Sequence, residues 1–172
     1  MTTPRKLPLV LLAFFIIVIL TIKSLGMLIN VTPSMKEGIY IRASGEIKRG
    51  DIVAACLPDP YKTIGLEKFY IEKGRKCDGA DPVIKKVIAV PGDDVILAGD
   101  YISVNHHRIL LKTKNQDGMG RMLSIYPRGT YSHTKGYWLV GTNSPNSWDS
   151  RYWGAIPKTQ ILYKLKPVWV LT

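Results

Sequence analysis

The chain has 172 residues, which is enough for one modest domain with a buried core and a short appendage. Hydrophobic residues make up 46% and charged residues 22%, a globular composition that excludes a largely disordered chain. The formal net charge of +11 indicates attraction to an anionic partner, either lipid headgroups or nucleic acid.

An uncharged apolar run over residues 7–22 dominates the N-terminus and follows Arg5 and Lys6. It predicts one membrane-spanning helix, with the basic residues on the cytoplasmic side and the remaining chain across the membrane. A cleaved signal peptide fits the same pattern, although no small-x-small cleavage site follows at good spacing, and a buried core helix is a third alternative. We therefore expect an anchor over residues 1–29 and an extracytoplasmic domain over residues 30–172.

Short β-branched runs separated by Gly, Pro and Asp turns follow the anchor, and no long helical periodicity appears. This pattern predicts a mainly β, compact domain. The predicted strands are Ile39–Ile41, Asp51–Ala54, Val83–Val90, Asp94–Leu97, Tyr101–Val104, Tyr137–Val140 and Ile161–Val170. Two stretches, 57–82 and 112–135, are expected to be long loops that are functional or loosely ordered.

Cysteine and histidine are too sparse for a metal site. Cys56 and Cys77 are the only cysteines, and the three histidines show no ligand spacing, so we expect no metal and no cofactor. A disulfide between the two cysteines is expected if the domain lies in an oxidising compartment. The alternative is that both are ordinary small apolar residues.

Three segments hold residues that could carry chemistry: 32–35, 85–93 and 141–154. Lys85 lies in an apolar predicted strand, where burying an ammonium group is costly. Strand alternation directs consecutive lysines to opposite faces, so one of the pair that starts at Lys85 can point inward. Taken alone, Ser34 is an unremarkable serine and Lys85 could simply protect an edge strand from pairing.

Together these segments resemble the type I signal peptidase family, most closely its short branch that processes conjugative-transfer pilins, the TraF type. The resemblance covers residues 31–157 and consists of three boxes in family order. The boxes are Ser34-Met35, Lys85-Lys86-Val87-Ile88-Ala89-Val90-Pro91-Gly92-Asp93 and Asn146-Ser147-Trp148-Asp149-Ser150-Arg151-Tyr152-Trp153-Gly154. The chain departs from the family pattern at Lys86, usually Arg, and at Thr142, usually Asp, which puts a structural ion pair in doubt.

The resemblance implies a compact signal-peptidase-like β-fold with a Ser–Lys dyad. Ser34 would be the nucleophile and Lys85 its base, a role that requires a neutral amine and therefore a lysine pKa far below its reference value. Ser147 would hydrogen-bond and orient the lysine. The backbone N–H of Ser34 and the hydroxyl of Thr32 would bind the oxyanion.

Asp149 and Arg151 would support this site. Ile39, Ile84 and Val87 are expected as walls of shallow pockets for an extended substrate. The implied function is a membrane-bound serine endopeptidase that removes signal or leader peptides, or matures a conjugative-transfer pilin precursor, by cleavage after small residues.

The expected location is the bacterial inner membrane, with a single span and the catalytic domain on the periplasmic side. The expected partners are a precursor protein and anionic lipid. A catalytically silent, membrane-tethered β-domain that acts as a secretion or conjugation scaffold is the main alternative. Nucleic-acid binding is not expected because the basic residues are dispersed. Membership of the self-cleaving repressors, which use the same dyad, is disfavoured because those proteins are cytosolic and this chain begins with an expected anchor.

Overall fold

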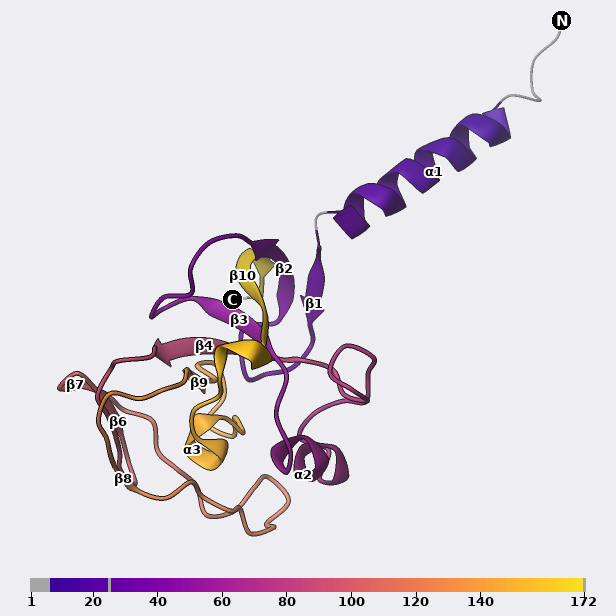
Figure 1. Cartoon of the computed structure of the whole chain (residues 1–172). Helices are drawn as coiled ribbons and strands as arrows, with labels where there is room; N and C mark the ends of the chain where they lie inside the picture. The colour runs from indigo at the N-terminus through magenta and orange to yellow at the C-terminus, as the bar shows by residue number, and fades with distance from the viewer. Residues whose placement is uncertain (1–6, 25, 172) are drawn as a thin grey trace, which may run out of the picture.

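The computed structural model describes residues 7–24 and 26–171. A β domain follows an N-terminal helix that extends away from it (Figure 1). The elements in chain order are α1 Leu7–Ser24, β1 Leu28–Asn30, β2 Gly38–Ala43, β3 Ile52–Ala55, α2 Tyr61–Glu67, β4 Val83–Ala89, β5 Val95–Leu97, β6 Ile102–Val104, β7 His107–Ile109, β8 Gly129–Tyr131, β9 Trp138–Val140, α3 Ser150–Trp153, the 3-10 turn Lys158–Gln160 and β10 Ile161–Val170.

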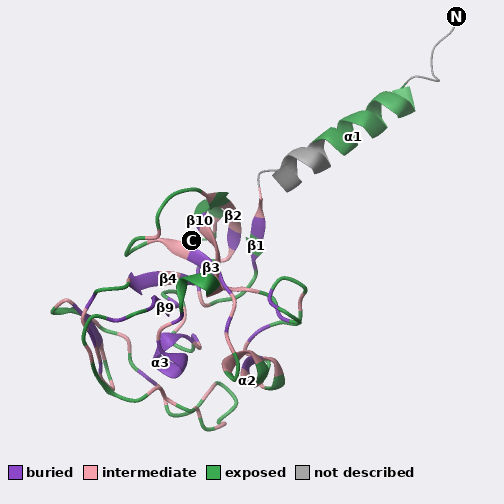
Figure 2. Ribbon diagram, viewed as in Figure 1, coloured by how far each residue is buried: buried purple, intermediate pink, exposed green. Residues whose placement is uncertain are grey.

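The N-terminal helix α1 is 18 residues long, and its residues up to Ile17 are exposed (Figure 2). Large hydrophobic side chains from Leu7 to Ile17 are exposed along it. Within the described residues, no helix is long and apolar enough to cross a membrane, so the expected membrane-spanning helix is not found. The expected cytoplasmic placement of Arg5 and Lys6 falls outside the described residues.

The larger sheet has six antiparallel strands in the order β1-β2-β10-β3-β4-β9. Its long central strand β10 pairs with β2 on one side and β3 on the other. In β10, Pro167 lies past the last residue that pairs with β3. Its lack of a backbone N–H therefore removes no hydrogen bond between β10 and β3. This sheet contains β1 and β2, which flank the loop that carries Ser34, and also β4, which carries Lys85.

The smaller sheet has four strands in the order β7-β6-β5-β8. Asn105 and His106, both with positive φ, form the two-residue turn between β6 and β7, as expected for a hairpin turn whose twist matches the strands. The strand β7 after this turn is not among the strands predicted from the sequence. Strands β1 and β8 also lie outside the predicted set.

The two predicted long loops are only partly loops. The stretch 57–82 contains α2, a helix of seven residues, and 112–135 contains β8. A helix of two turns gives too few repeats for periodicity to be recognised. The prediction of a mainly β domain is confirmed, and all seven predicted strands are present with small shifts at their ends.

Buried apolar residues form three clusters around the larger sheet. One packs β3, β4 and β9 against α3 and the 57–82 stretch, the second fills the space between β9 and the smaller sheet, and the third lies where β2, β3 and β10 meet. Strand β4 contributes side chains to all three clusters. Most of β4 is buried (Figure 2), and Lys85 is one of its buried residues.

Candidate active site

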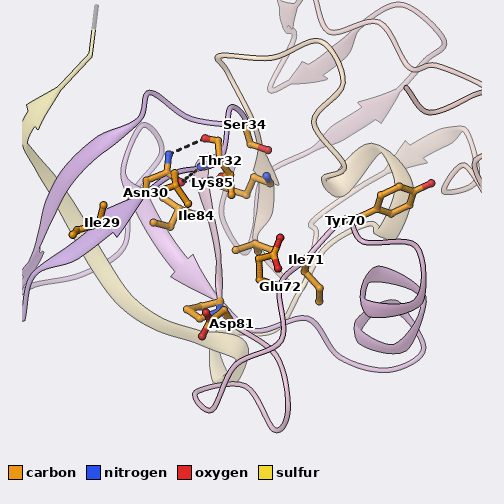
Figure 3. Close-up of a pocket in the computed structure, with 13 residues that line it drawn as sticks. Ile29, Asn30, Thr32, Ser34, Tyr70, Ile71, Glu72, Asp81, Ile84 and Lys85 are labelled. Atoms are coloured by element: carbon orange, nitrogen blue, oxygen red, sulfur yellow. Dashed lines mark hydrogen bonds between the residues drawn. The ribbon is translucent and has the colours of Figure 1, made fainter. Parts of the chain in front are cut away.

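A cavity of about 150 Å³ lies between the loop that follows β1 and the start of β4 (Figure 3). Ser34 and Lys85 both line it, and Figure 3 shows the lysine side chain extended toward the serine. The other lining residues are Ile29, Asn30, Val31, Thr32, Tyr70, Ile71, Glu72, Asp81, Pro82, Val83 and Ile84. The fold therefore brings together two residues that lie 51 positions apart in the chain.

Lys85 occupies the third position of β4, opposite Val53 of β3, and is 4% exposed. Its neighbour Lys86 is half-buried, so the predicted division of the two lysines between inside and outside is confirmed. Burial lowers the pKa of Lys85 to about 8; Asp149 opposes this shift, and the positive charge of Arg151 adds to it. A substantial fraction of the side chain is then neutral in mildly alkaline solution.

The Ser34 loop is attached to the 141–154 segment by three contacts. The Asn143 backbone N–H donates to the Ser34 carbonyl at 3.1 Å, and its side-chain amide donates to the Pro33 carbonyl at 3.2 Å. The Thr142 hydroxyl lies 3.6 Å from the sulfur of Met35, which is buried. These contacts fix the backbone on both sides of Ser34 while leaving Ser34 itself half-buried.

Asp149 and Arg151 form a buried ion pair beneath this site. Both oxygens of Asp149 accept hydrogen bonds from the guanidinium at 2.8 Å, and Asp149 also accepts the Gly141 N–H at 2.9 Å. The guanidinium donates further to the carbonyls of Ser147 and Lys112. Such a bidentate pair, whose guanidinium donates four hydrogen bonds, is the arrangement in which buried charges are tolerated.

The hydrogen bond expected between Ser147 and Lys85 is not formed. The Ser147 hydroxyl is buried and has no hydrogen-bond partner within the described part of the chain. It packs against Gly141 instead, so closely that a Cβ at Gly141 would lie 2.1 Å from its oxygen and 2.8 Å from the Ser34 carbonyl oxygen. The Ser147 hydroxyl therefore lies in tight packing against Gly141 and not in a bond to the lysine.

Thr32 lies beside Ser34, but its hydroxyl already has a partner. It donates to Asn30 Oδ1 at 2.8 Å (Figure 3). Asn30 was not singled out from the sequence, and Gly141 and Asn143 lie in the 141–154 segment but were given no role of their own. An asparagine at a strand end and a glycine before a polar loop are both common, so only the spatial contacts identify them.

Two further expectations concern the surroundings of the site. Ile84 lines the cavity as predicted, but Val87 packs into the core and neither it nor Ile39 reaches the cavity. Cys56 and Cys77 are joined by a disulfide, where the sequence left bonded and free cysteines as open alternatives. The bond ties the end of β3 to the 57–82 stretch, which supplies one wall of the cavity.

Across residues 7–24 and 26–171, no three His, Cys, Asp or Glu side chains are grouped so that they could hold a metal ion. Lys86 forms no ion pair in the same part of the chain, in keeping with the departure from the family pattern at Thr142.

Comparison with known families agrees with the motif resemblance. A family model described as signal peptidase, peptidase S26, matches residues 3–170. The chain therefore belongs to the peptidase S26 signal peptidase family.

The relatives of this chain include conjugation proteins. The plasmid transfer protein TraF of Escherichia coli is 29% identical over 153 residues, which are 83% of this chain and 82% of the relative. A probable conjugal transfer protein TraF of Sinorhizobium fredii is 31% identical over 144 residues, 80% of this chain and 73% of the relative. A crystal structure of a signal peptidase I from Enterococcus faecalis has 21% identity and a TM-score of 0.40, covering 72% of this chain and 100% of that chain.

Proposed function

We propose that this chain is a membrane-associated serine endopeptidase in which Ser34 is the nucleophile and Lys85 is the general base. The observation that carries the proposal is the pairing of Ser34 with a buried lysine of lowered pKa in one cavity. A serine hydroxyl needs a base to become nucleophilic, and a lysine can serve only when it is neutral. Family membership supports peptide bonds as the substrate.

In the proposed reaction, Lys85 Nζ removes the hydroxyl proton as Ser34 Oγ attacks the scissile carbonyl. The resulting ammonium returns the proton to the leaving amine when the tetrahedral intermediate collapses to an acyl-enzyme. Water, activated by the same lysine, then releases the acyl group. The oxyanion would be bound by the backbone N–H of Ser34 and by the hydroxyl of Thr32.

We propose a precursor protein with small side chains before the cleaved bond as the substrate. A cavity of about 150 Å³, to whose lining Ile71, Val83 and Ile84 contribute apolar side chains, suits small residues better than aromatic ones. The TraF relatives favour a precursor that belongs to a conjugative-transfer apparatus. Within this assignment, residues 30–172 form the protease domain.

We further propose that α1 attaches the protein to a membrane, with the protease domain on the oxidising, periplasmic side of the bacterial inner membrane. Exposed apolar side chains from Leu7 to Ile17 favour transfer from water into lipid. The net charge of +11 favours anionic headgroups. The disulfide supports an oxidising compartment.

Cleavage of a precursor-derived peptide by the full chain in detergent tests the dyad. We expect Ser34→Ala and Lys85→Ala to abolish cleavage of a peptide with alanine at the first and third positions before the bond. The matched controls are Ser44→Ala and Lys86→Ala, which remove an exposed serine and the neighbouring half-buried lysine. Full activity in either Ser34→Ala or Lys85→Ala would end the assignment, and an inactive unmodified chain would favour the silent scaffold.

A further inference from the structure

The side chain of Asn30 forms a hydrogen-bonded centre inside the Ser34 loop. Asn30 ends β1 and is 4% exposed. Its Nδ2 lies 3.0 to 3.1 Å from the carbonyl oxygens of Thr32, Met35 and Lys36. Its Oδ1 accepts the Thr32 backbone N–H at 3.2 Å and the Thr32 hydroxyl at 2.8 Å. One amide therefore contacts the loop on both sides of Ser34, and Figure 3 shows its contact with Thr32.

These partners permit only one orientation of the amide. Turning it over would place Oδ1 against three carbonyl oxygens and Nδ2 against the two donors of Thr32. The Tyr40 hydroxyl also donates to the Lys36 carbonyl, at 2.6 Å, and so closes the end of the loop. The loop is thus built around a single buried polar group whose hydrogen-bonding capacity is fully used.

The Thr32 hydroxyl has one proton, and in this structure that proton is donated to Asn30. It cannot be donated to a substrate oxyanion at the same time. A charged oxygen is a stronger acceptor than a neutral amide oxygen, so the proton should turn toward the substrate as negative charge develops. Asn30 Oδ1 would still hold the Thr32 backbone N–H, so the residue would stay in place while its proton moves.

We propose that Asn30 is a positioning residue that holds Thr32 ready to donate to the transition state. This inference rests on the proposed Ser34–Lys85 function. Asn30 itself would not contact the substrate. Asn30 fixes the Thr32 side chain in one rotamer beside Ser34. Its neutral Oδ1 accepts the Thr32 hydroxyl proton until the developing oxyanion takes over as the acceptor.

A double-mutant cycle separates this role from simple loop support. The full chain in detergent is compared with Asn30→Ala, Thr32→Val and the double variant, using the alanine-containing peptide. Because removing one oxyanion donor costs about 100-fold to 1,000-fold in kcat, we expect an indirect contributor such as Asn30 to cost about tenfold to 100-fold, with KM nearly unchanged. In the Thr32→Val background the same change should cost less than about threefold.

An equal loss in both backgrounds would mean that Asn30 only supports the loop, and unchanged kcat in Asn30→Ala would also overturn the proposal. Asn115→Ala, which changes an exposed asparagine outside the cavity, is the matched control. Cleavage that persists in Ser34→Ala would instead refute the proposed function.

A spectroscopic measurement tests the same inference independently of activity. Three-bond couplings to the Thr32 methyl group report its χ1 rotamer. We expect one rotamer in the unmodified chain and averaging between rotamers in Asn30→Ala. A single unchanged rotamer in the variant would overturn the proposal even if the chain cleaved no peptide.

Discussion

Replacing Lys85 with methionine should make the folded protein more stable while removing the proposed base. Methionine keeps a long flexible side chain of similar shape but carries no charge. The structure places the Lys85 ammonium where burial lowers its pKa from 10.5 to about 8, despite the opposing charge of Asp149. The folded state therefore gives up the lysine proton more readily than the unfolded state does.

The sign and size of the effect follow from these two values. At pH 7 both states are mostly protonated, and lowering the pKa from 10.5 to about 8 corresponds to a folding penalty of about 3 kcal/mol. Between pH 8 and 10.5 the unfolded chain binds more protons than the folded chain, so the penalty shrinks as the pH rises. At pH 10 it should be below about 1 kcal/mol.

Urea unfolding of the full chain in detergent at pH 7, 8.5 and 10 measures this difference. We expect the stability advantage of Lys85→Met over the unmodified protein to fall from about 3 kcal/mol toward about 1 kcal/mol across the series. Lys86→Met, which changes the half-buried neighbour, is the matched control. An advantage that is absent at pH 7, or equal at all three pH values, would refute the assignment of Lys85 as a buried lysine of lowered pKa.

Four other outcomes are expected. Peptidase activity should rise with pH through about 8 as Lys85 becomes neutral, and a pH–rate profile that is flat from pH 6 to 9 would contradict this. Gly141→Ala should lower kcat at least about tenfold because its Cβ would collide with the Ser147 hydroxyl, whereas Gly118→Ala, which has open space around it, should not. Arg151→Ala should destabilise the protein by about 3 to 5 kcal/mol because it leaves a buried carboxylate unpaired, and a loss below 1 kcal/mol in urea unfolding would argue against the buried pair. Reducing the disulfide, which spans 21 positions, should cost about 3 kcal/mol of stability by the chain-entropy estimate, and unfolding curves that coincide with and without reductant would contradict it.

The sequence predicted correctly those elements whose structure follows from a local pattern of residues. Alternation of apolar residues located the strands and correctly separated buried Lys85 from half-buried Lys86. The seven-residue helix α2 was missed because it offers too few periodic positions. Pairing of Cys56 with Cys77 could not be decided because sequence spacing does not give the distance between two side chains.

The site shows the same division between local pattern and spatial contact. Ser34, Lys85 and the Asp149–Arg151 pair lie in recognisable boxes, and the fold places them around one cavity or directly beneath it. The Ser147 bond to the lysine was an inference from resemblance, and the close packing at Gly141 gives that hydroxyl a different environment. Asn30 was not predictable, because its importance comes from five contacts that only the folded loop creates.

Trapping the acyl-enzyme tests the central assignment most directly. The full chain would be mixed with an ester of a precursor-derived peptide, quenched in acid and digested, and the modified peptide identified by mass spectrometry. The Ser34–Lys85 dyad predicts one acyl group on Ser34, formed faster as the pH rises through about 8 and absent from Ser34→Ala. An acyl group on another residue, or one that still forms in Ser34→Ala, would contradict it.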